Sequence, residues 1–168
     1  FTWERSHITP ARRAQKFHHK ALFTVFTGQQ SEDKDKLAKA LEEELFKQNK
    51  NTYYLGINDE VFRSATTMNN KTLVRVQYIK QLGEIAHILS DAGKIIITSV
   101  SDVDEYELDM LKALNRPHKT LVVNVGESQF DSKKIDIHLA EISDQAKALA
   151  EIINRINQDT RLDPQFSI

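Results

Sequence analysis

Cysteine is absent from the sequence, and glycine is scarce. Five glycines occur in 168 residues, whereas average usage of about 7 % would give about twelve. Without cysteine the chain can form neither a disulfide framework, a thiolate zinc site nor an iron–sulfur cluster, and its composition favours a reducing compartment. Loops that bring the backbone close to a phosphate are built from glycine, so few such loops are expected.

The chain also lacks an excess of charge and a long apolar run. Its 23 basic and 24 acidic residues give a formal net charge of −1, so no overall field would attract nucleic acid or an anionic membrane. No apolar run approaches the ~20 residues of a membrane span, and no signal-peptide pattern opens the chain. The composition therefore predicts a soluble, cytoplasmic globular domain that binds neither nucleic acid nor a membrane.

Apolar periodicity divides the chain into alternating short and long segments. Apolar runs rich in β-branched or aromatic residues predict buried strands at 21–27, 94–100 and 120–125. A further strand is predicted at 52–55, and a weaker one with alternating apolar residues at 135–139. Helical spacing predicts helices at 34–48 and 73–92, a third running from a cap at Asp102 to about 114, and a fourth running from a cap at Ser143 to 156.

This alternation is typical of a doubly wound α/β domain with a parallel five-stranded sheet. We expect the domain to span 21–158, with a leader or connector at 1–20 and a tail at 159–168. In an open sheet of this kind, ligands bind beyond the carboxyl ends of the strands. The loops that follow positions 27, 55, 100 and 125 are therefore the places where chemistry is expected.

The first of these loops has the layout of a phosphate-binding loop. The usual pattern is G-x-x-x-x-G-K-S/T, in which backbone N–H groups cradle phosphates, the lysine reaches the β- and γ-oxygens and the hydroxyl binds magnesium. Gly28 and Lys34 stand at the right separation. Asp33 replaces the second glycine, and Asp35 replaces the hydroxyl residue.

Several blocks in a fixed order resemble the adenylylsulfate kinase family. They lie at 26–28, 37–43, 53–55, 83–86, 90–93 and 95–98, and the leader at 3–13 is also similar. The resemblance runs from about 3 to 125 and returns weakly at 135–156. It implies a P-loop fold of the nucleoside-kinase type, and an enzyme that transfers phosphate from ATP, with magnesium, to the 3′-hydroxyl of adenosine 5′-phosphosulfate.

The sequence departs from the family where the reaction would take place. Of the family's loop, T-G-L-S-G-S-G-K-S-T, it keeps Thr27, Gly28, Lys34 and a displaced Ser31. The family's D-G-D-x-x-R motif, which positions substrate and metal, leaves Asp59 and Arg63 as candidate remnants, with the spacing stretched by one. The other interpretation of these two residues, which we favour, is an ion pair within a loop.

Further substrate-binding residues of the family are replaced. The asparagine and the two arginines of its N-I-R-R-V-G-E run correspond to Tyr78, Lys80 and Gln81. Its I-S-P-F-R segment corresponds to 101–105, which carries acids instead. Only a short connection joins 125 to 135, so we expect the family's basic lid to be missing.

Acids also surround Lys34. Glu32, Asp33 and Asp35 stand at a predicted helix start, where free N–H groups and the helix dipole would otherwise attract an anion. They would repel a triphosphate, and Asp33 adds a Cβ where the backbone must approach the phosphate. Lys34 is therefore either a surviving phosphate ligand or a solvated lysine at a helix start, and we favour the second.

Other candidate sites are weaker. The histidines, including His18 and His19, have no partners at metal-ligand spacing, so no zinc site is expected. Ser99 and Ser101 lack the small-residue elbow of a hydrolase nucleophile. The acids between 102 and 109 fit the solvated, acidic first turn of a helix better than a cation site.

Our leading hypothesis is a degenerate adenylylsulfate-kinase-like domain without catalysis or cofactor, which serves as a structural, regulatory or dimerising module in sulfate activation. One alternative is a divergent kinase that binds Mg-ATP through Gly28 and Lys34, and another is a nucleotide site that regulates without phosphate transfer. The resemblance implies a partner, the GTPase-type domain of sulfate adenylyltransferase, in the same chain or complex. A start at Phe1 would fit such a fusion.

Overall fold

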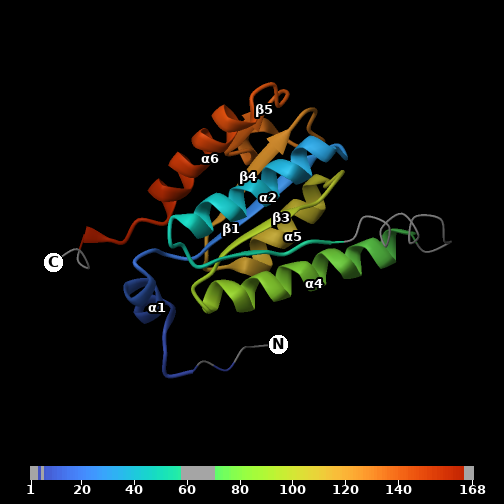
Figure 1. Ribbon diagram of the computed structural model, residues 1–168. Helices are drawn as coiled ribbons and strands as arrows, with labels where there is room; N and C mark the ends of the chain where they lie inside the picture. The colour runs from blue at the N-terminus through green and yellow to red at the C-terminus, as the bar shows by residue number, and fades with distance from the viewer. Residues whose placement is uncertain (1–3, 5, 58–70, 165–168) are drawn as a thin grey trace.

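Strands and helices alternate along the chain (Figure 1). The computed structural model describes residues 4, 6–57 and 71–164. The elements are α1 (Pro10–Phe17), β1 (Leu22–Gly28), α2 (Glu32–Lys47), β2 (Thr52–Tyr54), α4 (Lys71–Asp91), β3 (Ile95–Ser99), α5 (Glu105–Asn115), β4 (Thr120–Val125), the 3-10 helix η1 (Ser132–Lys134), β5 (Ile137–Leu139) and α6 (Gln145–Asp159).

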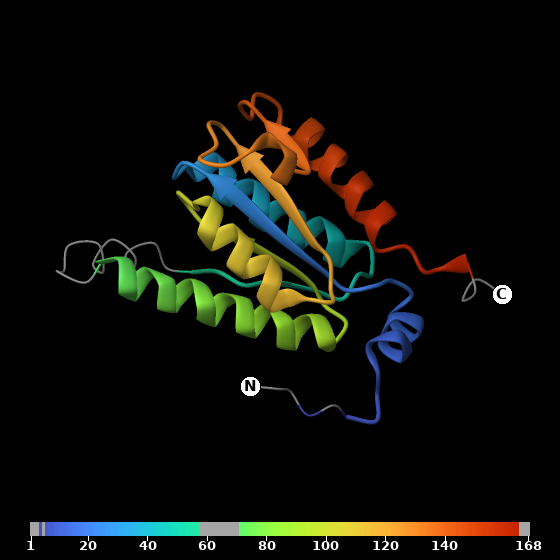
Figure 2. The same cartoon turned by 180° about the vertical axis from the view of Figure 1, so that it is seen from behind.

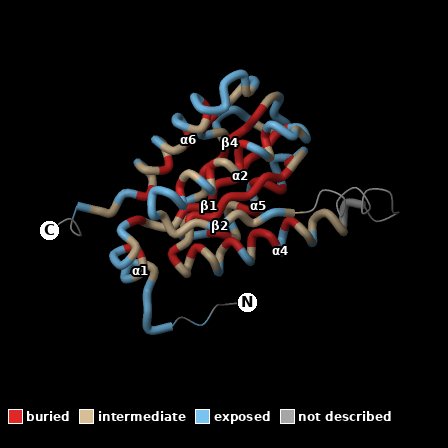
Figure 3. Tube along the Cα trace, viewed as in Figure 1, coloured by how far each residue is buried: buried red, intermediate tan, exposed pale blue. Residues whose placement is uncertain are grey.

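The five strands form one parallel sheet in the order β2-β3-β1-β4-β5. β1 is the central strand, and every one of its residues is buried, as the red tube at the centre of Figure 3 shows. Successive side chains of a strand point to opposite faces. Leu22 and Phe26 accordingly pack in the core under α2 and α6, whereas Phe23 and Val25 pack in the core under α4 and α5. The predicted doubly wound sheet is thus confirmed.

The helices lie in two layers, one on each face of the sheet. Figures 1 and 2, which view the molecule from opposite sides, show α2 and α6 over one face and α4 and α5 over the other. A short connection that carries only η1 joins β4 to β5, in agreement with the predicted absence of a lid. None of the helices in the described ranges is long and apolar enough to cross a membrane.

Two helices begin later than the sequence analysis predicts. Asp104, not Asp102, caps α5: its carboxylate accepts from the N–H of Glu107 at 2.8 Å, and the Glu107 carboxylate accepts from the N–H of Asp104 at 3.1 Å. This reciprocal pair satisfies two backbone donors, which a cap at Asp102 would not do. Asp144, not Ser143, caps α6, because its carboxylate reaches the N–H of Lys147 at 3.2 Å.

The leader contains a helix that the sequence analysis did not predict. Thr9 caps α1 and Pro10 occupies its first turn, a favourable place for a residue without an N–H. Past this helix, the N–H of Lys20 donates to the carbonyl of Thr160 at 2.7 Å, and the Lys20 ammonium pairs with Asp163 at 2.7 Å. The segment that enters β1 and the segment that leaves α6 are therefore joined.

His19 lies buried where α1 leads into β1. Its Nδ1 donates to the carbonyl of Lys20 at 2.9 Å, and its Nε2 accepts from the N–H of Asn51 at 3.0 Å. These two roles require a neutral ring with its proton on Nδ1. Burial lowers the pKa of His19 below 6.5, and the neighbouring charges of Lys50 and His18 lower it further, against the opposing effect of the Lys20 hydrogen bond.

His19 should make the stability of the protein depend on pH. Because its pKa is lower in the folded than in the unfolded chain, the unfolded chain binds more protons below about pH 6.5. The free energy of unfolding should therefore decrease as the pH is lowered below about 6.5. His19 alone should contribute at most about 1.4 kcal/mol of this decrease per pH unit. Urea unfolding between pH 7.5 and 5.5 measures it.

The variant His19→Gln isolates the contribution of this one group. It should be less stable at every pH and should show a shallower fall between pH 7.5 and 5.5 than the native chain. The matched control His138→Gln changes an exposed histidine of β5 and should keep the native slope. Equal slopes for the native chain and His19→Gln would show that His19 does not titrate in this way.

Candidate functional site

The carboxyl ends of β1, β3 and β4 meet at one edge of the sheet. The N–H of Val100 donates to the carbonyl of Phe26 at 2.9 Å, and the N–H of Asp102 donates to the carbonyl of Gly28 at 2.8 Å. The loop after β3 is thereby bound to the end of β1. The first predicted loop and the loop that follows β3 therefore form one site.

Gly28 ends β1 at a position where no other residue fits. Its φ is +116°, and a Cβ built on it would lie 2.0 Å from the carbonyl oxygen of Val125 on the neighbouring strand. Both the backbone conformation and the close approach require glycine. This observation explains why Gly28 persists in a sequence that holds few glycines.

Lys34 is buried, which contradicts the favoured prediction of a solvated lysine. Its backbone N–H donates to the Ser31 hydroxyl that caps α2, at 3.4 Å, and its side chain is fully enclosed. The ammonium donates to the Ser101 hydroxyl at 3.1 Å and to the carbonyl of Gly28 at 3.4 Å. The sequence predicted neither contact, because Ser101 arrives from a loop far along the chain.

The acids around Lys34 differ in their surroundings. Glu32 and Asp33 are exposed in the first turn of α2, where carboxylates favour the helix dipole. Asp35 is half-buried, and its carboxylate accepts from the Ser99 hydroxyl at 2.7 Å. Asp35, which stands where a P-loop carries its magnesium-binding hydroxyl, is thus bound to Ser99 at the end of β3.

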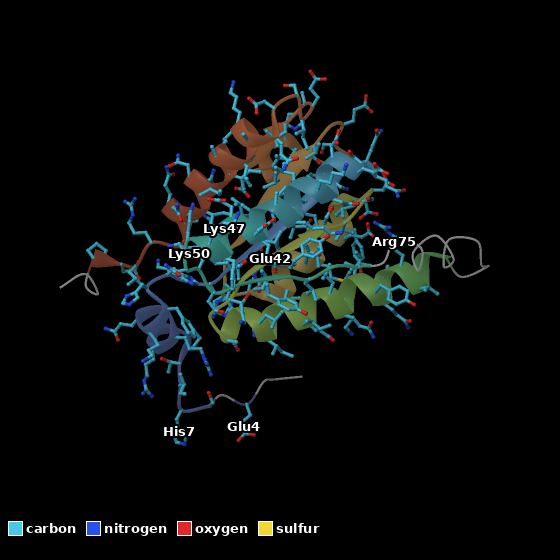
Figure 4. All side chains as sticks on the ribbon, in the orientation of Figure 1. Glu4, His7, Glu42, Lys47, Lys50 and Arg75 are labelled. Carbon is cyan, nitrogen blue, oxygen red and sulfur yellow. The ribbon has the colours of Figure 1, made fainter. Side chains whose placement is uncertain are left out.

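Arg75 is a residue of this edge that the sequence analysis missed. It lies on α4 near the end of the sheet where β1 and β3 finish (Figure 4). Its guanidinium donates to the Glu107 carboxylate at 2.6 Å and to the carbonyl of Ser101 at 2.9 Å. Nothing in the local pattern marks Arg75, because its partners come from α5 and from the loop after β3.

The sequence analysis expected the acids between 102 and 109 to form a solvated face, but the structure buries one of them. The Glu107 side chain is 5 % exposed and pairs with Arg75. Glu105 and Asp109 remain exposed and face Lys134, at 3.5 and 2.8 Å respectively. The hydrogen bond that Lys134 donates to the Asp109 carboxylate raises the pKa of Lys134. These acids therefore bind side chains of the same chain.

A small cavity of about 130 Å³ opens beside Gly28. Asn124 forms part of its wall, accepts from the Thr27 hydroxyl at 2.8 Å and donates to the carbonyl of Gly126 at 2.9 Å. Asp102 and Glu127 line the cavity, and no lysine or arginine lines it among the described residues. It is smaller than ordinary ligand pockets, which hold about 300–1,000 Å³, and its charge is unfavourable for a phosphate.

Asp59 and Arg63, the candidate remnants of the substrate and metal motif, lie outside the described residues. Their pairing stays a prediction. Across 4, 6–57 and 71–164, no group of three or more His, Cys, Asp or Glu side chains has the geometry to hold a metal ion.

Comparison with known sequences links the chain to one family. The family model described as Adenylylsulphate kinase matches residues 20–136. The adenylyl-sulfate kinase of Buchnera aphidicola is 34 % identical over 98 residues, which cover 58 % of this chain and 46 % of the relative. That of Shewanella amazonensis is 28 % identical over 138 residues, which cover 82 % and 63 %. The chain thus spans about half to two thirds of the length of these relatives.

Solved structures share the fold. A hexameric APS kinase from Thiobacillus denitrificans aligns with a TM-score of 0.70 and 15 % identity, covering 87 % of this chain and 30 % of that chain. The Mycobacterium tuberculosis APS kinase in complex with AMPPNP and APS aligns with a TM-score of 0.64 and 15 % identity, covering 82 % and 96 %. At this identity the likeness concerns the arrangement of strands and helices.

Gly28 and Gly126 form a matched pair for testing the close approach at this edge. Gly28→Ala places a Cβ against the carbonyl of Val125 and should lower the free energy of unfolding by more than about 3 kcal/mol. Gly126 also has a positive φ, of +81°, but has open space around it, so Gly126→Ala should cost only about 1–2 kcal/mol. Urea unfolding measures both. If both variants lost the same free energy of unfolding, the close approach of Gly28 to Val125 would add nothing to the cost of replacing the glycine.

Proposed function

This chain belongs to the adenylylsulphate kinase family, and from that premise we propose that it is a degenerate, catalytically inactive domain of sulfate activation. The observation that carries this proposal is the position of Lys34. Its ammonium is buried and bound to the Gly28 carbonyl and the Ser101 hydroxyl. In a working P-loop this group reaches the β- and γ-oxygens of the nucleotide.

The neighbours of Lys34 support the same conclusion. Phosphoryl transfer depends on positioning and on the stabilisation of negative charge. Asp33 stands where the loop needs a glycine, and the Asp35 carboxylate is already engaged by Ser99. To receive Mg-ATP, the loop would have to break the contacts of Lys34, move Asp35 and accept the triphosphate beside exposed acids.

A divergent, active kinase is the second candidate. Gly28 and Lys34 keep the family's separation, and Lys34 stays in contact with the end of β1. A change of side-chain rotamer that breaks the hydrogen bonds to Gly28 and Ser101 would turn the ammonium toward the position of a bound phosphate. Binding of nucleotide without transfer is an intermediate case, in which the domain would act as a regulatory site.

Calorimetric titration separates these candidates. The native chain should bind neither Mg-ATP nor adenosine 5′-phosphosulfate with a Kd below about 1 mM, and it should form no phosphorylated product when both are present. Micromolar binding of both with turnover would establish the active kinase. Binding of a nucleotide without turnover would establish the regulatory site.

A restored loop tests the physical reason. The double variant Asp33→Gly with Asp35→Ser returns the glycine and the hydroxyl, and it should bind Mg-ATP at least about tenfold more tightly than the native chain. The control Asp33→Asn with Asp35→Asn removes the same two charges without restoring the loop. Equal gains in both variants would mean that charge alone excludes the nucleotide.

In the same proposal, the domain is a structural or regulatory module beside the GTPase-type domain of sulfate adenylyltransferase, in one chain or one complex. The family supplies the connection with sulfate activation. Sulfate adenylyltransferase activity purified from the source cells should contain peptides of this chain in constant ratio to the GTPase-type domain. Complete separation of the two during purification would contradict this role. A homodimer of the domain is compatible with either outcome.

A further inference from the structure

A chain of hydrogen bonds leads from α5 through Arg75 to Lys34. The Arg75 guanidinium donates to both oxygens of the Glu107 carboxylate, at 2.6 and 3.2 Å. Its Nη2 also donates to the carbonyls of Ser101 and Asp102, which form the tip of the loop after β3, at 2.9 and 3.3 Å. The Ser101 hydroxyl in turn accepts from the Lys34 ammonium at 3.1 Å. Helices α4, α5 and α2 are thereby connected through this loop tip.

We propose that Arg75 and Glu107 form an autoinhibitory latch, which holds the loop tip against the end of β1. The latch keeps the Ser101 hydroxyl on the Lys34 ammonium and so keeps that ammonium from an anion at the Gly28 loop. Opening the latch would let the ammonium turn toward a phosphate group. This inference rests on the proposed function, because it names what holds the phosphate loop of the inactive domain closed.

Glu107 gives the latch a fixed anchor. Its side chain is 5 % exposed, and its Oε1 also accepts from the N–H of Asp104 at 3.1 Å in the cap of α5. Because this cap fixes the carboxylate, and because a planar guanidinium binds a carboxylate through two bonds, the orientation of Arg75 is fixed as well. Separating the pair would leave a buried carboxylate without its counter-charge, which is strongly unfavourable. The latch therefore differs from a flexible surface ion pair.

The loop tip depends on polar contacts for its position. Val100 and Val103, on either side of it, are buried in the core under α4 and α5. Between them Ser101 is half-buried and Asp102 is exposed. Asp102 has a φ of +57°, a left-handed conformation that a residue with a side chain adopts at a cost. Loss of the Arg75 bonds should therefore let the tip move, while the two valines keep the ends of the loop in place.

The double variant Arg75→Met with Glu107→Gln opens the latch without leaving a buried charge. Methionine removes the donors, and glutamine keeps an oxygen that can accept from the N–H of Asp104. Acetylation of the lysines, followed by mass spectrometry, measures the reactivity of buried Lys34 against that of exposed Lys36. In the native chain Lys34 should react at least about a hundredfold more slowly than Lys36, and in the double variant this difference should shrink at least about tenfold.

Two controls show that the effect is local. Arg155→Met removes a guanidinium that pairs with Asp159 on α6, and it should leave the reactivity of Lys34 unchanged. In the double variant the amide of Asp102 should lose protection from hydrogen exchange, whereas the amide of Val25, in the centre of β1, should keep its native protection. The single variant Glu107→Gln weakens the latch with less disturbance of the fold, and it should give an intermediate reactivity of Lys34.

Pyrophosphate tests the consequence for binding. The double variant removes one positive and one negative charge, so its net charge alone predicts no gain in affinity for an anion. Calorimetry should nevertheless show binding at least about tenfold tighter than in the native chain, and Lys34→Met added to the double variant should abolish the gain. The latch is overturned if Lys34 stays as unreactive as in the native chain, if Asp102 keeps its protection, or if the gain survives Lys34→Met. Turnover of Mg-ATP by the native chain would instead contradict the proposed function.

Discussion

The complete burial of β1 is the constraint on which the rest of the structure depends. A strand covered on both faces needs apolar side chains at alternate positions on both sides, and Leu22, Phe23, Val25 and Phe26 supply them. Each such side chain contributes about 1.5–3 kcal/mol when it leaves water. The two helix layers follow from this requirement, as do the parallel neighbours β3 and β4. The carboxyl end of β1 then fixes where the loop with Gly28 and Lys34 stands.

The two ends of the sheet are opposite in their electrostatics. At the carboxyl end the cationic side chains of Lys34 and Arg75 are held by other groups of the chain: Lys34 by Ser101 and Gly28, and Arg75 by Glu107. At the amino end Lys50 and Arg161 share a cavity without a described carboxylate. The family's fold usually receives anions beyond the carboxyl ends of its strands. In this chain the basic side chains at the other end lie where α1, α2 and α6 end, and helix C-termini favour cationic side chains.

The fold was predictable from sequence because local pattern determines it. Strands with continuous apolar runs were placed correctly, and β4 matches its predicted range 120–125. The caps of α5 and α6 were misplaced by one or two residues, because several acids compete for each helix start and only the three-dimensional contact selects one. The environments of Lys34 and Glu107 were mispredicted, because their partners Ser101 and Arg75 lie far away in sequence. No local periodicity carries that information, and the remnants Asp59 and Arg63 stay predictions.

The contact between Lys20 and the segment after α6 has a mechanical consequence. The backbone bond to Thr160 and the ion pair with Asp163 link the chain where it enters β1 to the chain where it leaves α6. Tension applied through these two segments would load those two bonds first, because they form the shortest path between the points of attachment. The hydrogen bonds that join β1 to β3 and β4 would bear the force only after these two contacts had broken. The central strand is thus shielded from pulling by a contact that lies outside the sheet.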